Sequence, residues 1–308
     1  MEAAQTMVPN AIEIVEVAPR DGLQNEKVAM ATADKLALIA RAIAAGARRI
    51  EVTSFVNPRA VPQMADAEAV ATALPHHDQV TYIGLVMNAR GAGRALATGR
   101  IDQLGAVAVA TDSFAMANQN QTSDGSVAAA SDIIAMAQAA GKTAQVTIAA
   151  AFGCPFEGEM APDRVLAMAA ALAQAGPVEI GLADTIGVAD PAQVSRLVAR
   201  VRDLIAPIPV RVHFHNTRGT GLANVWAAVL AGAATVDAAI GGLGGCPFAP
   251  GASGNVATED VVYMLQRAGV ATGLDLRALI AANHWLGGVM DRTLPGMVAR
   301  APVFPKGS

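Results

Sequence analysis

Eight strand patterns, each followed by a helix pattern, alternate along the chain. The strand patterns are period-two or continuous apolar stretches, and the helix patterns repeat apolar residues every three or four positions. We predict strands at residues 11–17, 49–55, 80–87, 103–111, 144–152, 178–184, 210–215 and 235–240. We predict the intervening and following helices at residues 34–45, 64–74, 90–98, 126–140, 162–175, 191–205, 222–231 and 258–268.

This alternation restricts the chain to parallel α/β architectures. Several strands are continuous apolar runs, which is typical of a parallel sheet covered on both faces. Eight βα units without a strand reversal predict an α/β fold of the (β/α)8 TIM barrel type. An open doubly wound sheet is the alternative, but it predicts a dinucleotide-binding glycine fingerprint after the first strand. Residues 19–23, Pro-Arg-Asp-Gly-Leu, do not form one.

The length is compatible with one domain. Of the 308 residues, 53% are hydrophobic, which is enough for a large core, and barrels of this size are routinely single domains. We therefore predict a single domain over residues 1–308, with the barrel at about 11–270. Helix patterns at 274–280 and 285–294 predict extra C-terminal helices, within about 271–300, that pack on the barrel or on a neighbouring subunit.

Charge and cysteine content narrow the functional class. The net charge is −4 and no Lys/Arg cluster stands out, so nothing indicates a nucleic-acid partner or a membrane surface. Two cysteines, Cys154 and Cys246, exclude a disulfide framework and suit a reducing compartment. No apolar run approaches a membrane span, and residues 1–10 lack the features of a signal peptide. We expect a cytoplasmic enzyme.

Two histidines mark the end of the seventh predicted strand, within Val-Arg-Val-His-Phe-His-Asn-Thr at residues 210–217. Alternate residues of a strand point to the same face, so His213 and His215 project together and Phe214 points the other way. Two imidazoles on one face can bind one divalent ion. A pair of buried histidines bonded to the backbone would show the same spacing, so this pair alone leaves both interpretations open.

Polar residues recur where the predicted strands end, and active sites of this barrel lie at those ends. The residues are Arg20, Asp21, Glu51, Thr53, Ser54, Cys154, Asp184, Thr185, Asn216, Asn255 and Glu259. Asp21, the two histidines and the amide oxygen of Asn255 would form a mixed oxygen and nitrogen site that favours Mg²⁺ or Mn²⁺ over a closed zinc site. In isolation, Asp21 and Asn255 are also ordinary turn residues.

The glycine loop, residues 241–255, contains six glycines in fifteen residues. Such a segment cannot be a packed strand throughout, and it is long enough to be a mobile lid. It lacks the Lys-Ser/Thr pair of a phosphate-binding P-loop. Cys246 lies within it, where a thiol can act as acid or base or can be an inert apolar residue, whereas we predict Cys154 to be inert.

Five motifs resemble those of the hydroxymethylglutaryl-CoA lyase family. They are Val-Ala-Pro-Arg-Asp-Gly-Leu-Gln-Asn-Glu-Lys at 17–27, Glu-Val-Thr-Ser-Phe-Val at 51–56, Gly-Cys-Pro-Phe-Glu-Gly at 153–158, Asp-Thr-Ile-Gly at 184–187, and the glycine loop with its continuation at 241–260. The resemblance runs in the same order from about Ile12 to Gly273. Other metal-dependent barrel lyases and synthases share the Arg-Asp start and the His-x-His strand but not the glycine–cysteine loop, which is therefore the most specific motif.

The resemblance implies a (β/α)8 barrel that binds Mg²⁺ or Mn²⁺ and cleaves 3-hydroxy-3-methylglutaryl-CoA to acetyl-CoA and acetoacetate, as in leucine degradation. It also implies a homodimer and an acyl-CoA as the partner molecule. Asp21, His213, His215 and Asn255 correspond to metal ligands, and Arg20, His213 and Cys246 to catalytic residues. Gln24, Glu51, Asp184 and Glu259 match polar positions of the family's site.

Four departures from the family pattern affect the substrate expectation. Asn216 stands where the family commonly has Asp, Arg218 where it has Tyr, and Phe248 where it has Tyr, and residues 114–118 lack the expected lysines. The barrel and the metal site do not depend on these positions. Related enzymes cleave other 3-hydroxyacyl-CoAs, such as citramalyl-CoA, in the same way, so the motifs leave the acyl group open.

Three other classes of protein remain as alternatives. A condensing acyl-CoA synthase on the same barrel would share Arg20, Asp21 and both histidines, but the glycine–cysteine loop argues against it. A non-catalytic metal-binding or interaction protein would not require Arg20 and Cys246. A redox thiol protein is disfavoured because the chain has no Cys-x-x-Cys motif.

Overall fold

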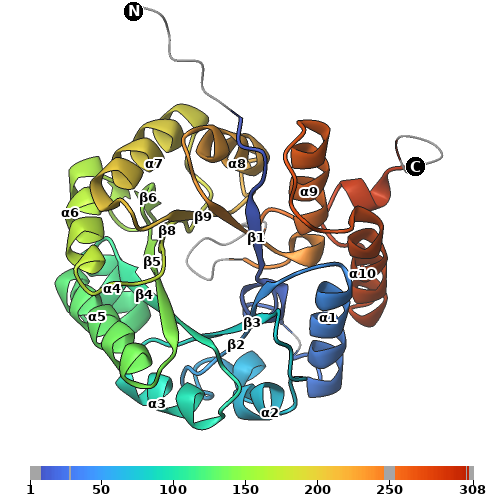
Figure 1. The fold of residues 1–308 in the computed structure, drawn as a ribbon, viewed down its shortest axis with the longest axis horizontal. Coiled ribbons are helices and arrows are strands. Elements are labelled where there is room, and N and C mark those ends of the chain that lie inside the picture. Colours follow the sequence, from blue (N-terminus) through green and yellow to red (C-terminus); the bar gives the residue numbers. More distant parts are fainter. Residues whose placement is uncertain (1–7, 28, 246–253, 303, 305–308) are drawn as a thin grey trace, which may run out of the picture.

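Eight parallel strands close into a barrel in a computed structural model that describes residues 8–27, 29–245, 254–302 and 304 (Figure 1). The barrel strands are β1 (Glu13–Glu16), β2 (Arg49–Ser54), β3 (Thr81–Leu85), β4 (Gln103–Val109), β5 (Thr143–Ala149), β8 (Ile180–Asp184), β9 (Val210–Phe214) and β10 (Thr235–Ala238). Each strand pairs in parallel with the next barrel strand, and β1 pairs with β10 to complete the closure. The predicted (β/α)8 barrel is confirmed, and the open doubly wound sheet is excluded.

A ring of helices surrounds the barrel (Figure 1). They are α1 (Thr32–Ala44), α2 (Ala67–Thr72), α3 (Ala89–Ala97), α5 (Ser123–Ala139), α6 (Pro162–Ala173), α7 (Pro191–Ile205), α8 (Gly221–Leu230) and α9 (Thr258–Arg267). Shorter helical turns are η1 (Ala18–Gly22), η2 (Pro62–Met64), η3 (Ile240–Gly242) and η4 (Val298–Arg300).

Helix α7 shows how local sequence produces these outer helices. Asp190 caps its start by accepting hydrogen bonds from the N–H groups of Ala192 and Gln193, and Pro191 occupies the first turn, where a missing N–H costs nothing. Its buried residues recur every three or four positions: Val194, Leu197, Val198, Val201 and Ile205. This apolar stripe packs on the outside of the barrel and leaves the charged face to solvent.

Three segments differ from the predicted elements. Helix α4 (Asp112–Gln119) lies where we predicted a polar loop, because its buried Phe114 and Ala115 anchor a short helix too brief to show periodicity. A small hairpin, β6 (Gly153–Cys154) and β7 (Gly158–Glu159), follows β5. The two helices predicted at 274–280 and 285–294 form the single helix α10 (Leu276–Val289), because Ala282 and Asn283 between them are also buried on the same face.

Many of the side chains inside the barrel are polar or charged, and most of the apolar core lies between the strands and the helices. On β2, Arg49 points inward and contacts Gln103, Gln145 and Glu179 across the barrel, whereas its neighbour Ile50 is buried on the outer side. Interiors of this fold are usually filled by branched apolar side chains. A charged interior therefore needs a dense set of paired groups, because an unpaired buried charge would be strongly destabilising.

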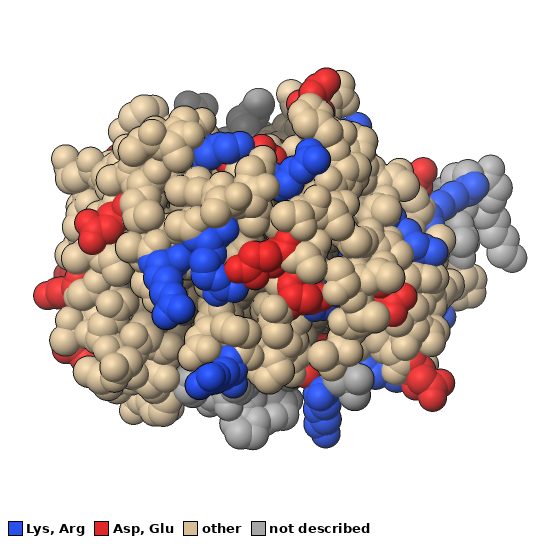
Figure 2. All heavy atoms as spheres, turned by 90° about the horizontal axis from the view of Figure 1, so that it is seen from below, with Lys and Arg blue, Asp and Glu red and all other residues tan. Residues whose placement is uncertain are grey.

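The outer surface mixes charges of both signs. On the face shown in Figure 2, basic side chains lie among acidic ones, and uncharged surface separates these groups. None of the described helices combines the length and the apolar character required to span a bilayer.

Candidate active site

A cavity of about 170 Å³ opens at the carboxyl ends of the barrel strands. Its lining includes Arg20, Asp21, Gln24, Glu51, Thr147, Thr185, Arg211, His213, His215 and Asp237. A larger hollow of about 760 Å³ lies beside α9 and α10. Another, of about 980 Å³, lies at the opposite end of the barrel. Among the described residues, the one cluster with metal-ligand spacing is in the smaller cavity, so we place the site there.

Asp21, His213 and His215 form this cluster. The Nε2 atoms of His213 and His215 each lie 3.9 Å from Oδ2 of Asp21, and the three ligand atoms are within 4.8 Å of one another. The two imidazole rings, centred 5.2 Å apart, project from the end of β9 on the same side. Residues that are far apart in the sequence thus converge on one point.

A π-helical turn, η1, brings Asp21 and Arg20 into the cavity. It follows β1 directly, and the N–H groups of Arg20, Asp21 and Gly22 all donate to the carbonyl of Val17. Such wide turns are rare and occur frequently at functional sites. The Arg20 guanidinium bridges two carboxylates, with contacts of 2.6 Å to Asp21 and 2.5 Å to Glu51. The arginine is thereby held against Asp21, beside the candidate ligand cluster, with its orientation fixed.

Asn255 completes the cluster from the far end of the glycine loop. Its Nδ2 donates to Asp21 over 2.7 Å and to the carbonyl of Leu243 over 3.0 Å. Its Oδ1 is buried and has no hydrogen-bond partner among the described residues. A buried amide oxygen without a partner is costly unless something else binds it. One carboxylate, two imidazoles and a free amide oxygen fit a divalent cation.

The charge states of Asp21 and His215 suit cation binding. Burial alone would raise the pKa of Asp21, but Arg20 and the two histidines hold it below its usual range, so the carboxylate is ionised. Burial and the neighbouring His213 lower the pKa of His215 to about 4, so this imidazole is neutral near pH 7. Neutral imidazole and ionised carboxylate are the forms that bind metal ions.

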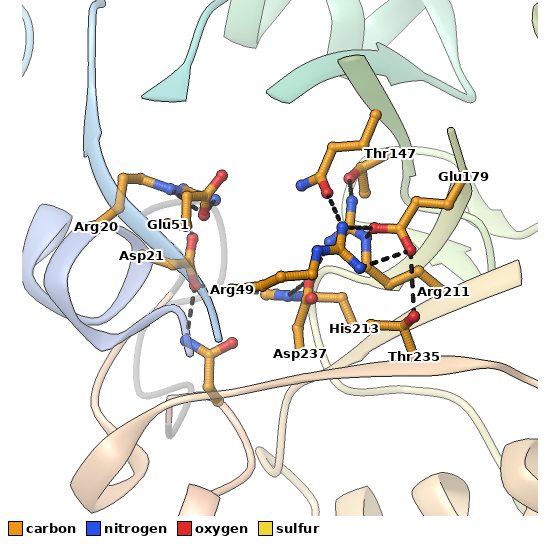
Figure 3. A network of polar contacts seen from close by, with 12 residues as sticks. Arg20, Asp21, Arg49, Glu51, Thr147, Glu179, Arg211, His213, Thr235 and Asp237 are labelled. Carbon is orange, nitrogen blue, oxygen red and sulfur yellow. Dashed lines mark hydrogen bonds and ion pairs between the residues drawn. The ribbon is translucent and has the colours of Figure 1, made fainter. Parts of the chain in front are cut away.

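His213 differs from His215 because it has an acidic partner. Its Nδ1 lies 3.1 Å from Oδ2 of Asp237. Burial opposes protonation of His213, but this hydrogen bond and the charges of Asp21 and Asp237 raise its pKa. Figure 3 shows Arg211, Asp237 and His213 in one group and Arg20, Asp21 and Glu51 in another, on the two sides of the cavity.

Sequence reasoning missed Arg211 and Asp237. Both line the cavity, and Arg211 forms an ion pair with Asp237. A signal was present, because Arg211 lies two residues before His213 and so shares its face of β9. Asp237 lies in the short buried strand β10, and a buried carboxylate usually has a charged or hydrogen-bonding partner.

The four remaining predicted site residues, Gln24, Glu51, Asp184 and Glu259, divide into two groups. Gln24 and Glu51 line the cavity together with Arg20, Asp21 and the histidines. Asp184 and Glu259 are not part of the described lining. Asp184 accepts hydrogen bonds from the N–H groups of Val188 and Ala189 and so fixes the turn after β8. Glu259 accepts from the N–H of Gly241 and from Asn283, and burial raises its pKa to about 7.

Two of the departures from the family pattern shape loops. Asn216 accepts a hydrogen bond from the N–H of Gly221, and Arg218 donates to the carbonyls of Ile186 and Gly187. Cys246 and Phe248 lie outside the described residues, as does the middle of the predicted lid. Cys154 is a buried residue of β6, and its Sγ lies 3.1 Å from the Thr111 hydroxyl.

Comparison with known proteins gives the family. A family model described as HMGL-like matches residues 11–285. The chain belongs to the HMGL-like family. This result confirms the resemblance derived from the five motifs.

Individual relatives of this HMGL-like chain align along almost its whole length. An (R)-citramalyl-CoA lyase of Chloroflexus aurantiacus is 45% identical over 307 residues, covering 96% of each chain. A hydroxymethylglutaryl-CoA lyase of Bacillus subtilis is 39% identical over 287 residues, covering 93% of this chain and 96% of that protein. A solved structure, described as an HMG-CoA lyase from Acinetobacter baumannii in complex with coenzyme A and 3-methylmalate, has a TM-score of 0.92 at 40% identity and covers 99% of this chain and 98% of its own.

Proposed function

We propose that this protein is a divalent-metal-dependent carbon–carbon lyase that cleaves 3-hydroxy-3-methylglutaryl-CoA to acetyl-CoA and acetoacetate. The observation that carries the proposal is the convergence of Asp21, His213 and His215 at one point beside Arg20. Relatives of about 40% identity that are named hydroxymethylglutaryl-CoA lyases support the choice of reaction. Mg²⁺ and Mn²⁺ are the proposed ions, because half of the donor set is oxygen.

Each site residue has its own role in the proposed reaction. A divalent cation held by Asp21, His213, His215 and Asn255 would make the tertiary hydroxyl of the substrate more acidic. His213 accepts the hydroxyl proton on Nε2 at the stage when that nitrogen is not a ligand, the C2–C3 bond breaks, and its electron pair passes into a thioester enolate. Arg20, always charged, stabilises the enolate oxygen. Cys246 then delivers a proton to the enolate carbon, which completes acetyl-CoA.

His213 has only one free ring nitrogen for its two proposed roles. Its Nδ1 is bonded to Asp237, so metal ligation and proton acceptance both require Nε2. One nitrogen can fill one role at a time. His213 therefore accepts the proton only when its Nε2 is not a ligand.

A second candidate substrate is citramalyl-CoA, which would yield acetyl-CoA and pyruvate by the same bond cleavage. It is favoured by the relative that is 45% identical and is named for that reaction. The two substrates differ by one methylene between the reacting carbon and the distal carboxylate. The same catalytic residues serve both.

Product analysis with a panel of thioesters tests these proposals. The metal-free protein is supplied with Mg²⁺ or Mn²⁺ and each 3-hydroxyacyl-CoA in turn, and both products are identified by mass spectrometry. Acetoacetate is the expected second product, and pyruvate would identify citramalyl-CoA as the substrate. Net condensation of acetyl-CoA with an oxo acid would favour a synthase, and metal binding without thioester consumption would favour a non-catalytic protein.

We further propose that the protein acts in the cytoplasm as a homodimer, in leucine degradation. The family resemblance and the two lone cysteines support this setting. Light scattering coupled to size-exclusion chromatography tests the dimer, and a monomer at working concentration would contradict it.

A further inference from the structure

A chain of ion pairs runs through the barrel interior and ends on His213 (Figure 3). Its successive contacts are Glu13–Arg49 at 2.8 Å, Arg49–Glu179 at 2.5 Å, Glu179–Arg211 at 3.0 Å, Arg211–Asp237, and Asp237–His213 at 3.1 Å. The charges alternate in sign along it. The reaction proposed above uses only His213, so the ion pairs that lead to it require an explanation.

Arg211 is held rigidly inside this chain. Its guanidinium contacts Glu179, Asp237 and the hydroxyl of Thr147, the last over 2.6 Å, and its side chain is 3% exposed. These partners lie on or beside three other strands, β8, β10 and β5. Hydrogen bonds to Asp237 and Thr147 and the ion pair with Glu179 restrict the planar guanidinium, and with it the carboxylate that it binds.

Asp237 in turn fixes His213. Its Oδ2 contacts both Arg211 and Nδ1 of His213. An ionised carboxylate can only accept hydrogen bonds, so Nδ1 of His213 carries a proton. In the neutral ring, the lone pair is then on Nε2, which faces Asp21 at 3.9 Å.

We propose that Asp237, anchored by Arg211, is a positioning residue that fixes the tautomer and ring orientation of His213 and so presents its Nε2 to the cation. The inference rests on the metal site of the proposed function. Partners of this kind set metal affinity by about 10- to 100-fold, because they remove the cost of orienting the ligand. The ionic chain is therefore the support that keeps one metal ligand in place.

Asp237→Asn tests the proposal with two measurements that do not depend on turnover. In the metal-free wild type at alkaline pH, ¹⁵N NMR should show His213 protonated on Nδ1. In Asp237→Asn, the ¹⁵N chemical shifts of Nδ1 and Nε2 should move toward each other, because both tautomers are then populated. Mn²⁺ titration followed by electron paramagnetic resonance should show about 10- to 100-fold weaker binding by the variant. Protonation of wild-type His213 on Nε2, or Mn²⁺ binding by the variant within twofold of wild type, would overturn the proposal.

Two further variants separate positioning from general damage to the barrel. Thr235→Val removes a hydroxyl from the same face of β10, where it contacts Glu179 and not His213, and should leave the tautomer and the Mn²⁺ affinity unchanged. If Asp237→Asn does not fold, Arg211→Met combined with Asp237→Asn removes both charges together and keeps the interior balanced. This double variant should also lose the fixed tautomer and bind Mn²⁺ more weakly, and wild-type behaviour in both measurements would overturn the proposal.

The same titration separates this inference from the proposed function. Absence of Mn²⁺ binding by the wild type would overturn the metal site itself, and with it the presentation of Nε2 to a cation. Binding by the wild type that Asp237→Asn preserves would overturn only the role of Asp237.

Discussion

At the scale of single residues, Glu16 joins three segments of the site. Its Oε1 accepts hydrogen bonds from the N–H groups of Ala18 and Ile240, and its Oε2 accepts from the Thr258 hydroxyl. Ala18 begins the turn that carries Arg20 and Asp21, Ile240 precedes the glycine loop, and Thr258 follows Asn255. The carboxyl is fully buried, and this burial raises the pKa of Glu16 to about 7.

Glu16 should make the stability of the fold depend on pH. Because its pKa is 4.5 when unperturbed and about 7 in the folded protein, the folded state holds the proton more tightly. Its contribution to the free energy of unfolding is fully present below pH 4.5 and is lost as the pH rises to about 7. The total loss is about 3 kcal/mol, because one pKa unit corresponds to about 1.4 kcal/mol. Urea unfolding of wild type and Glu16→Gln between about pH 5 and pH 8 measures the difference.

The Gln variant can keep the hydrogen bonds of Glu16 through its amide oxygen and NH₂, but it does not titrate. Its stability relative to wild type should therefore rise with pH across that window. A constant difference between the two proteins would contradict the prediction. Glu68→Gln is a control, because the pair between Glu68 and Arg94 is partly exposed and contributes no more than about 1 kcal/mol.

Cys246 is the residue on which the last proton transfer depends. Cys246→Ser should lower kcat by about 10²- to 10⁴-fold, because a hydroxyl is a much weaker acid than a thiol. Mn²⁺ affinity should stay unchanged, since the thiol is not among the proposed ligands. Cys154→Ser is the matched control, because Cys154 is buried away from the cavity and a serine can still bond Thr111. Turnover like that of wild type in Cys246→Ser would remove Cys246 from the mechanism.

At the scale of elements, the two ends of the glycine loop pack tightly against each other. Asn255 N–H donates to the carbonyl of Leu243, and His215 and Asn255 form an antiparallel bridge. A Cβ atom added to Gly254 would lie 2.5 Å from the Leu243 carbonyl carbon and 2.6 Å from the Gly242 oxygen. Only glycine fits there, and the position of its backbone determines the position of Asn255.

Gly254→Ala should therefore push Asn255 away from Asp21. We expect the free energy of unfolding to fall by about 1–3 kcal/mol through overpacking, and Mn²⁺ affinity to fall about tenfold as one ligand is displaced. Calorimetry measures both quantities. Gly93→Ala in α3 is the control, because its added Cβ meets nothing within 4 Å, and it should stabilise by about 0.5–1 kcal/mol. Mn²⁺ affinity equal to that of wild type in Gly254→Ala would contradict this account of the loop.

At the scale of the whole molecule, the cation would link parts of the chain that are far apart in sequence. Asp21 follows β1, His213 and His215 lie at the end of β9, and Asn255 follows the glycine loop. A ligand that binds only the folded state stabilises it according to its concentration relative to Kd. The melting temperature should therefore report metal binding directly.

Removing the metal with a chelator should lower Tm. At a cation concentration of 100 Kd the stabilisation is about 2.7 kcal/mol, which corresponds to a shift of about 5 °C for a chain of this size. Differential scanning fluorimetry with Mg²⁺ or Mn²⁺ against chelator measures the shift. Asp21→Asn should abolish most of it, and a shift of equal size in that variant would contradict the assigned site.

The barrel and the direction of its key side chains were predictable from local sequence patterns. Apolar periodicity specified eight strands and their helices, and the His-x-His spacing placed His213 and His215 on one face, because both properties depend only on backbone geometry over a few residues. Short or irregular segments were harder to predict. Helix α4 is too short to show a period, and α10 continues through residues that carry no strong pattern.

Which polar residues meet follows from the three-dimensional fold and not from local patterns. Closure of the barrel brings Asp21 within 3.9 Å of both histidines, places Asp237 and Arg211 behind His213, and leaves Asp184 and Glu259 to fix backbone turns outside the described cavity. Strand periodicity predicts the face on which a side chain lies, but not its partner across the barrel. That partner depends on the register between strands and on the paths of loops, which are set by packing over the whole chain.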